Sequence, residues 1–244
     1  MSAALTIEPG DPLLAEVAAR GFALVRGNAL SGRLGAAGEA AALEEFAASW
    51  DRLETDGFMA DGGRYRRRRL ANYRAKAGVP GHVRGKHRPH FQAVVHNSLN
   101  GGVERWFAPI EDAVAEGATL HALLDLGRSV ADQKAPGQDW FVEVHQFRIE
   151  AVAGAPGYPT PEGVHHDGVD LVLIGMVART NLQGGETLIT DNAGGELARF
   201  TLLDRLDTAF IDDGRVMHGV TPVQPADPGA ASCRDVLVIT WKRA

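Results

Sequence analysis

The pattern of apolar and polar positions divides the chain into a helical first part and a β-rich second part. Apolar side chains recur at helical spacing in the first part, and a short apolar run at 21–25 predicts a strand between two of the helices. Thr119, two residues after Gly117, is a candidate N-cap for the last helix. The predicted helices are 11–20, 33–55, 103–116 and 119–133.

From Trp140 onward, short β-rich runs are separated by Gly, Pro and Asp pairs. Regular spacing of about eight short strands favours a jelly roll, or double-stranded β-helix, which is the architecture of cupins. We therefore expect a mostly β protein with flanking helices, a single domain over 1–244 with mainly helical support at 1–135 and a jelly-roll core at 136–244. The predicted strands are 140–150, 164–167, 170–179, 186–190, 197–202, 208–212, 216–221 and 235–242.

Composition narrows the class of protein. Hydrophobic residues make up 45% and charged residues 23%, as expected for a soluble globular protein with a core. A net charge of −6 and a pI near 5.8 argue against general affinity for nucleic acid or for an anionic membrane. The lone Cys233 excludes an intramolecular disulfide framework and a Cys-rich zinc site. With no run near 18 apolar residues and no leader-like start, we expect a cytoplasmic protein. A homodimer is one oligomeric state that the sequence allows.

The sequence His165-His166-Asp167 carries the most informative chemistry. Residues i and i+2 of an extended segment project to the same side, so His165 and Asp167 can converge on one ion while His166 points away. His218, 51 positions beyond Asp167, would have to arrive from another strand. Two imidazoles and a carboxylate form the facial triad that holds iron at three corners and leaves three open. The alternatives are ordinary core or surface histidines and turn chemistry at Asp167-Gly168.

Arg234 opens the last predicted strand, where alternation places it on one face with Val236, Val238 and Thr240. Both faces of this strand are largely apolar, so the strand should be covered and the arginine should need an anion. The guanidinium fork binds a carboxylate through two parallel charge-assisted hydrogen bonds. The alternative is a structural pair with Asp235 or with a neighbouring strand.

Further polar positions are candidates for ligand recognition. Gln146 and Arg148 share a face of the strand 140–150 with two valines, which is typical of a pocket wall but also of a solvated outer face. Arg66 belongs to an arginine run, in which it shares a face with Arg64 and Arg68. One of these arginines could bind a substrate carboxylate, although such runs are usually solvated edges or interaction patches. Nucleic-acid binding by the run is disfavoured by the acidic chain.

The ordered set His165-x-Asp167, His218 and Arg234 resembles the iron(II)/2-oxoglutarate-dependent dioxygenase superfamily. The turn Gly184-Gly185-Glu186-Thr187 resembles that of its prolyl-hydroxylase branch. Residues 161–170, 179–186 and 234–237 are similar to the bacterial branch of free amino-acid hydroxylases that includes L-isoleucine 4-hydroxylase. The resemblance covers about 140–242.

The resemblance implies that His165, Asp167 and His218 are catalytic and bind Fe(II), and that Arg234 meets the distal carboxylate of 2-oxoglutarate. With O2 as oxidant, the enzyme would hydroxylate a free L-amino acid or similar small carboxylate, yielding succinate and CO2. The candidate residues near the co-substrate are Gln146, Asn181 and Thr187, with turn capping as the alternative for Asn181. The candidate substrate-binding residues are Arg148 and Arg66. Two other functions stay open, a tailoring oxygenase for a natural-product or carrier-bound intermediate and a non-catalytic or zinc-binding cupin-like module.

Overall fold

A computed structural model describes residues 10–95, 97 and 99–244. The helices are α1 (Pro12–Arg20), α2 (Gly27–Leu34), α3 (Ala40–Ala48), α4 (Asp112–Ala115) and α5 (Ala118–Lys134), with 3-10 turns at Gly35–Gly38 and Ser49–Arg52. The first strands are β1 (Phe22–Val25), β2 (Glu54–Thr55), β3 (Arg66–Ala75), β4 (Val83–Arg84), β5 (Trp140–Ala151) and β6 (Leu171–Thr180). The later strands are β7 (Leu182–Gly184), β8 (Glu186–Asp191), β9 (Glu196–Thr201), β10 (Thr208–Ile211), β11 (Val216–Val220), β12 (Val223–Pro225) and β13 (Ser232–Arg243).

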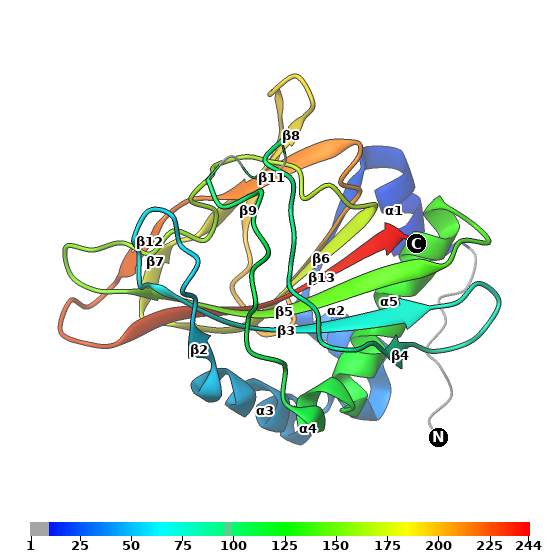
Figure 1. Cartoon of the computed structure of the whole chain (residues 1–244), viewed down its shortest axis with the longest axis horizontal. Helices are drawn as coiled ribbons and strands as arrows, with labels where there is room; N and C mark the ends of the chain where they lie inside the picture. Colours follow the sequence, from blue (N-terminus) through cyan, green and yellow to red (C-terminus); the bar gives the residue numbers. More distant parts are fainter. Residues whose placement is uncertain (1–9, 96, 98) are drawn as a thin grey trace.

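Two antiparallel sheets form the body of the described chain. The larger has the order β1-β10-β6-β13-β5-β3-β2, with β4 paired to β3. The smaller has the order β11-β8-β9, and β12 pairs with β7 in a separate ribbon. In Figure 1 the smaller sheet lies on one side of the larger sheet, and α3 and α5 lie on the other. This two-sheet arrangement confirms the mostly β, jelly-roll prediction with flanking helices.

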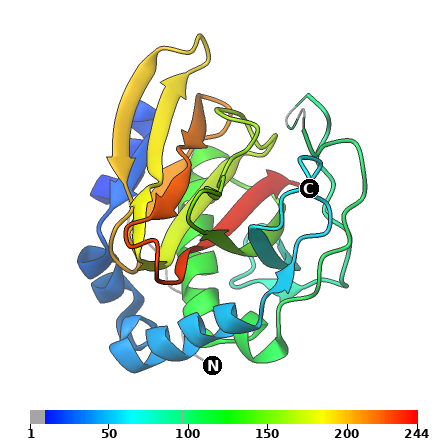
Figure 2. The same cartoon turned by 90° about the vertical axis from the view of Figure 1, so that its left-hand side faces the viewer.

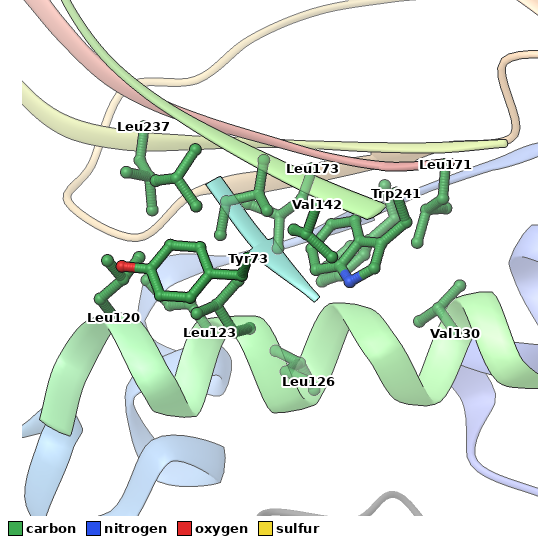
Figure 3. Close-up of a cluster of buried hydrophobic side chains, with 14 of the residues drawn as sticks. Tyr73, Leu120, Leu123, Leu126, Val130, Val142, Leu171, Leu173, Leu237 and Trp241 are labelled. Atoms are coloured by element: carbon green, nitrogen blue, oxygen red, sulfur yellow. The ribbon is translucent and has the colours of Figure 1, made fainter. Parts of the chain in front are cut away.

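The helical layer covers one face of the larger sheet. Leu120, Leu123 and Leu126 of α5 face the sheet and are almost completely buried. They pack against Leu237 and Trp241, two side chains of the central strand β13 (Figure 3). Burial of each large apolar side chain contributes about 1.5–3 kcal/mol, so this layer anchors the sheet.

A second apolar cluster lies on the other face, between the two sheets. Val172, Ile174 and Val236 of the larger sheet pack in it with Ile189 of β8 and Val216 of β11. Figure 2 shows the β8–β9 hairpin projecting from the body on the side away from α3 and α5. The space between the sheets therefore closes at one end with apolar packing and leaves room for a cavity at the other.

The strand predictions from Trp140 onward are largely confirmed, with one exception. Residues 164–167 form no strand, and His165 makes only a single bridge with His218. The helices at 11–20 and 119–133 are confirmed, whereas the 33–55 range is divided among the end of α2, two 3-10 turns, α3 and β2. Of the helix predicted at 103–116 only α4 forms, and the described residues of the preceding segment 85–111 contain no helix.

The first half of the chain is also more than a helical support. Strands β1, β2, β3 and β4 all join the larger sheet, and β3 pairs with β5 over ten positions. The division into 1–135 and 136–244 is therefore less sharp than expected, since both parts share one sheet and one core. In the part of the chain that the structure describes, no helix is long and apolar enough to cross a membrane.

Candidate active site

A cavity of about 560 Å³ is lined by the larger sheet, by β11 and by described residues of the segment 88–105. Its floor is the face of β13 that carries Arg234, Val236, Val238 and Thr240, as strand alternation predicted. His165, Asp167 and His218 also line it. The predicted triad and the predicted arginine thus share one cavity.

The three triad residues converge although only His218, in β11, lies on a regular strand. His165 Nε2 lies 3.5 Å from one carboxylate oxygen of Asp167, and His218 Nε2 lies 3.7 Å from the other. The backbones of His165 and His218 pair with each other through N–H···O bonds of 3.0 and 3.1 Å. Gly219 permits this close approach, because a Cβ there would lie 3.0 Å from a methyl of Val164.

A buried carboxylate fixes the loop that carries Asp167. Asp213 accepts the backbone N–H groups of Asp167, Gly168 and Val169 at 2.9, 2.8 and 3.1 Å. Gly168 has φ +79°, a conformation that side chains other than glycine rarely adopt, and it allows the chain to turn directly after Asp167. The position of the Asp167 side chain is therefore set by a hydrogen-bonded turn rather than by a strand.

Electrostatics and hydrogen bonding set the protonation states of the triad. Burial lowers the pKa of His218 to about 4, so this imidazole is neutral at pH 7. Burial opposes a charge on His165, but contact with Asp167 outweighs it and raises the pKa of His165 to about 9. His165 Nδ1 lies 3.0 Å from the carbonyl oxygen of Gly163, which can only accept, so Nε2 faces Asp167.

The donor set fits a divalent metal ion. The three residues offer ligand atoms that all lie within 4.8 Å of one another. Two imidazoles with one carboxylate form the set that non-haem iron(II) oxygenases use, with open positions left for other ligands. His166 lies outside the cavity lining, 3.9 Å from Asp213, as expected for a residue between two ligands.

Arg234 is a buried cation that forms no ion pair with any carboxylate among the described residues. Only 2% of the residue is exposed, and its Nε and Nη2 atoms have no hydrogen-bond partner among the described residues. Burial lowers the pKa of Arg234 to about 10, and the nearby charge of Arg179 acts in the same direction. The guanidinium still carries its charge at pH 7, so an anion in the cavity would satisfy it.

The prediction that Gln146 and Arg148 form a pocket wall is wrong. Both lie on the face of β5 that the helices cover, and the opposite face, with His145 and Phe147, lines the cavity. Gln146 donates to Ser49 Oγ at 2.8 Å, in the layer between the sheet and the helices. Arg148 forms two bonds of 2.8 Å with the carboxylate of Asp235, and this pair is structural.

Asn181 was also predicted to lie near the co-substrate, but it does not line the cavity. Its side chain bonds the backbone of Asp227 and Ala230, so that it caps a turn, which was the alternative interpretation. Thr187 is buried on β8 opposite Val220, a cavity-lining residue, but does not line the cavity itself. Arg66 does line the cavity, and its guanidinium is paired with Asp56 at 2.7 Å.

The structure adds a second cluster that the sequence did not indicate. His90, Glu143 and His145 also offer ligand atoms within 4.8 Å of one another on the cavity wall. Arg68 donates to Nδ1 of His145 at 2.7 Å, and its guanidinium lies between the rings of Phe107 and Phe147. This buried cation makes the cluster a poor site for a metal ion.

Three further cavity-lining residues that the sequence analysis missed come from irregular segments. Arg105, Gln92 and Glu162 all line the cavity, and none lies on a predicted strand. Gln92 donates to the carboxylate and the carbonyl of Asp167 at 3.3 Å. The only signal for Glu162 is its place three residues before His165.

Comparisons with known proteins agree with this geometry. The chain is 26% identical over 163 residues to the 3(1)-hydroxy-L-isoleucine 4-dioxygenase of Pantoea ananatis strain AJ13355, a match that spans 65% of this chain and 66% of that enzyme. It is similar to the crystal structure of a bsmA homolog from Methylobium petroleophilum PM1, with 35% identity, a TM-score of 0.87, and coverage of 100% of this chain and 97% of that one.

The crystal structure of IDO from Bacillus thuringiensis shares the fold, with a TM-score of 0.80 at 19% identity over 95% of this chain and 98% of that chain. The model of the 2OG-Fe dioxygenase family matches residues 47–240, which hold all three triad positions and Arg234. That family implies iron(II), 2-oxoglutarate and O2 as cofactor and co-substrates. The chain belongs to the 2OG-Fe dioxygenase family, and it is by that membership an Fe(II)/2-oxoglutarate-dependent dioxygenase.

Proposed function

We propose that this enzyme hydroxylates a C–H bond of a free L-amino acid or a similar small carboxylate. The observation that carries the proposal is the shared cavity, in which a two-histidine, one-carboxylate triad and a buried unpaired arginine face the same space. The related enzyme from Pantoea ananatis has a hydroxylated isoleucine in its name, which supports an amino acid as substrate.

In this proposal each residue has a defined task. His165, Asp167 and His218 hold iron(II), and Arg234 binds the distal carboxylate of 2-oxoglutarate. When bound, the iron, 2-oxoglutarate and O2 together supply the oxidising chemistry, with succinate and CO2 as co-products. The apolar side chains Val236 and Val238 lie on the same cavity floor as Arg234. They would exclude water from the ion pair between Arg234 and the distal carboxylate of 2-oxoglutarate.

The remaining part of the cavity is large enough for a small substrate beside 2-oxoglutarate. Ligand pockets typically span about 300–1,000 Å³, and the volume of about 560 Å³ must hold both molecules. The wall formed by β3, β5 and described residues of the segment 88–105 carries charged side chains, among them Arg68, Glu143 and Arg105. This lining favours a compact polar substrate.

A substrate panel tests the proposal. The protein is loaded anaerobically with iron(II) and 2-oxoglutarate, oxygen is admitted, and succinate is measured with each of the twenty standard L-amino acids. We expect at least one amino acid to raise succinate formation above the background and to gain the mass of one oxygen atom. His218→Ala is the control and should form no product. If no amino acid stimulates succinate formation, the substrate assignment is wrong, whereas the family membership is unaffected.

A further inference from the structure

Three buried arginines of the cavity lining share few direct counter-charges among the described residues. Arg66, Arg68 and Arg105 are each at most 5% exposed, and among the described residues only the carboxylate of Asp56 lies within 4.0 Å of any of them. Asp56 pairs with Arg66 at 2.7 Å and lies 3.7 Å from Arg68. Among the described residues, no carboxylate lies within 4.0 Å of the Arg105 guanidinium, and its Nε and Nη2 atoms lack a hydrogen-bond partner.

A buried negative charge lies on the triad side of the same cavity. The side chain of Glu162 is only 10% exposed, and one oxygen lies 3.6 Å from His165 Nε2. Its other oxygen, Oε2, is buried and has no hydrogen-bond partner within the described part of the chain. This carboxylate therefore has an unused acceptor next to the triad.

Arg105 and Glu162 face one cavity and attract each other across it without direct contact. Arg105 and Glu162 both line it, and no ion pair within 4.0 Å joins them in the described structure. Buried charges without partners are unfavourable, because each has lost its water without gaining a counter-charge. A ligand with an anionic group that accepts hydrogen bonds from the Arg105 guanidinium, and with a cationic group that donates one to Glu162, would pair with both side chains.

We propose that Arg105 and Glu162 bind the two charged groups of an α-amino acid. Arg105 binds the carboxylate through its two unpaired donors, and Glu162 accepts a hydrogen bond from the ammonium group through Oε2. Arg68, held between two aromatic rings, adds positive charge behind the carboxylate. This assignment rests on the proposed function, and it places the substrate's charged groups away from Arg234, on a different wall from 2-oxoglutarate.

The substitutions Glu162→Gln and Arg105→Met test the two contacts separately. Each removes one charge at nearly constant volume, and Arg105→Lys retains the charge but removes the fork. Matched controls are Glu104→Gln and Lys242→Met, because both residues line the cavity but are exposed. Binding of the standard L-amino acids is measured by anaerobic calorimetry on protein loaded with iron(II) and 2-oxoglutarate.

For the amino acid that binds best, each test substitution should weaken binding on the order of 10–100-fold, the usual effect of losing a charged hydrogen-bonded contact. The controls should change affinity less than threefold. Two analogues identify the contact, because wild type should discriminate against the methyl ester and against the analogue without the amino group. Arg105→Met should lose discrimination against the ester only, and Glu162→Gln against the deaminated analogue only.

Three outcomes would overturn the assignment. If an amino acid binds wild type and both test variants equally, the assignment of Arg105 and Glu162 is wrong while the proposed function survives. If Glu162→Gln loses iron or 2-oxoglutarate instead of the amino acid, Glu162 belongs to the metal site. If no amino acid binds wild type, the assignment of Arg105 and Glu162 and the proposed amino-acid substrate are both wrong. Should Arg105→Met not fold, Arg105→Lys still distinguishes these results, because the lost fork alone should weaken amino-acid binding.

Discussion

The turn that positions Asp167 depends on one carboxylate, and Asp213→Asn removes that carboxylate at constant shape. One oxygen of Asp213 accepts the N–H of Asp167, and the other accepts those of Gly168 and Val169. Asparagine retains a single acceptor oxygen, and its amide NH2 would face at least one of these donors. The substitution therefore leaves at least one N–H group unpaired in a site where Asp213 is only 2% exposed.

The magnitude follows from the lost contacts. A hydrogen bond to a charged group contributes about 1.5–3 kcal/mol, and the surviving bonds lose their charge, so unfolding should become easier by about 2–4 kcal/mol. Groups that orient a metal ligand typically change metal affinity by about 10–100-fold. We expect iron(II) affinity to fall by that factor because Asp167 is no longer held in place.

Two measurements with one control check this prediction. Urea unfolding of the metal-free protein gives the stability change, and anaerobic calorimetry with iron(II) gives the affinity. Asp212→Asn is the matched control, because Asp212 is a buried neighbour that pairs with Lys134 at 2.6 Å and does not contact the loop. The control should lose stability but keep iron affinity. Iron affinity of Asp213→Asn within twofold of wild type would refute the reasoning.

The remaining predictions concern three other positions. Arg148→Ala should destabilise the fold by about 2–4 kcal/mol, because Asp235 is left buried without its partner, and urea unfolding should show this loss; unchanged stability with weaker substrate binding would restore the pocket-wall interpretation. Arg234→Met should raise the 2-oxoglutarate concentration for half-maximal succinate formation by about 10–100-fold, and an unchanged requirement would exclude its proposed role. Burial and the charge of Arg68 hold the pKa of His145 well below its ordinary value of 6.5. The unfolded chain therefore binds a proton at His145 more readily than the folded protein does. The free energy of unfolding should be unaffected by His145 above pH 6.5 and should decrease as the pH falls below that value. Unfolding midpoints should therefore drop less between pH 7.5 and 5 in His145→Gln than in wild type.

The chemistry of the site could be predicted from sequence where alternation and spacing fix it. Arg234 shares its face with Val236 and Val238, and this alternation placed it correctly on the cavity floor. His165 and Asp167 were expected to converge and do so. The mechanism differs, because a turn held by Asp213 replaces the predicted strand.

The sequence does not show which face of β5 points toward the cavity and which toward the helices. Both of its faces mix apolar and polar residues, and a strand pattern does not say which face the helices cover. Gln146 bonds Ser49, and Arg148 bonds Asp51. Each pair is separated by 97 positions, so only the tertiary fold reveals these contacts. Arg105 was missed for a related reason, because it lies in an irregular segment whose local pattern was interpreted as a helix.

The central claim is that iron(II) and 2-oxoglutarate bind together in the cavity shared by the triad and Arg234. An anaerobic absorbance spectrum tests it most directly, because iron(II) chelated by 2-oxoglutarate gives a charge-transfer band that neither component gives alone. We predict that the band develops in wild type and is absent in His218→Ala at the same concentrations. A band of equal intensity in His218→Ala, or none in wild type loaded with both components, would contradict the account.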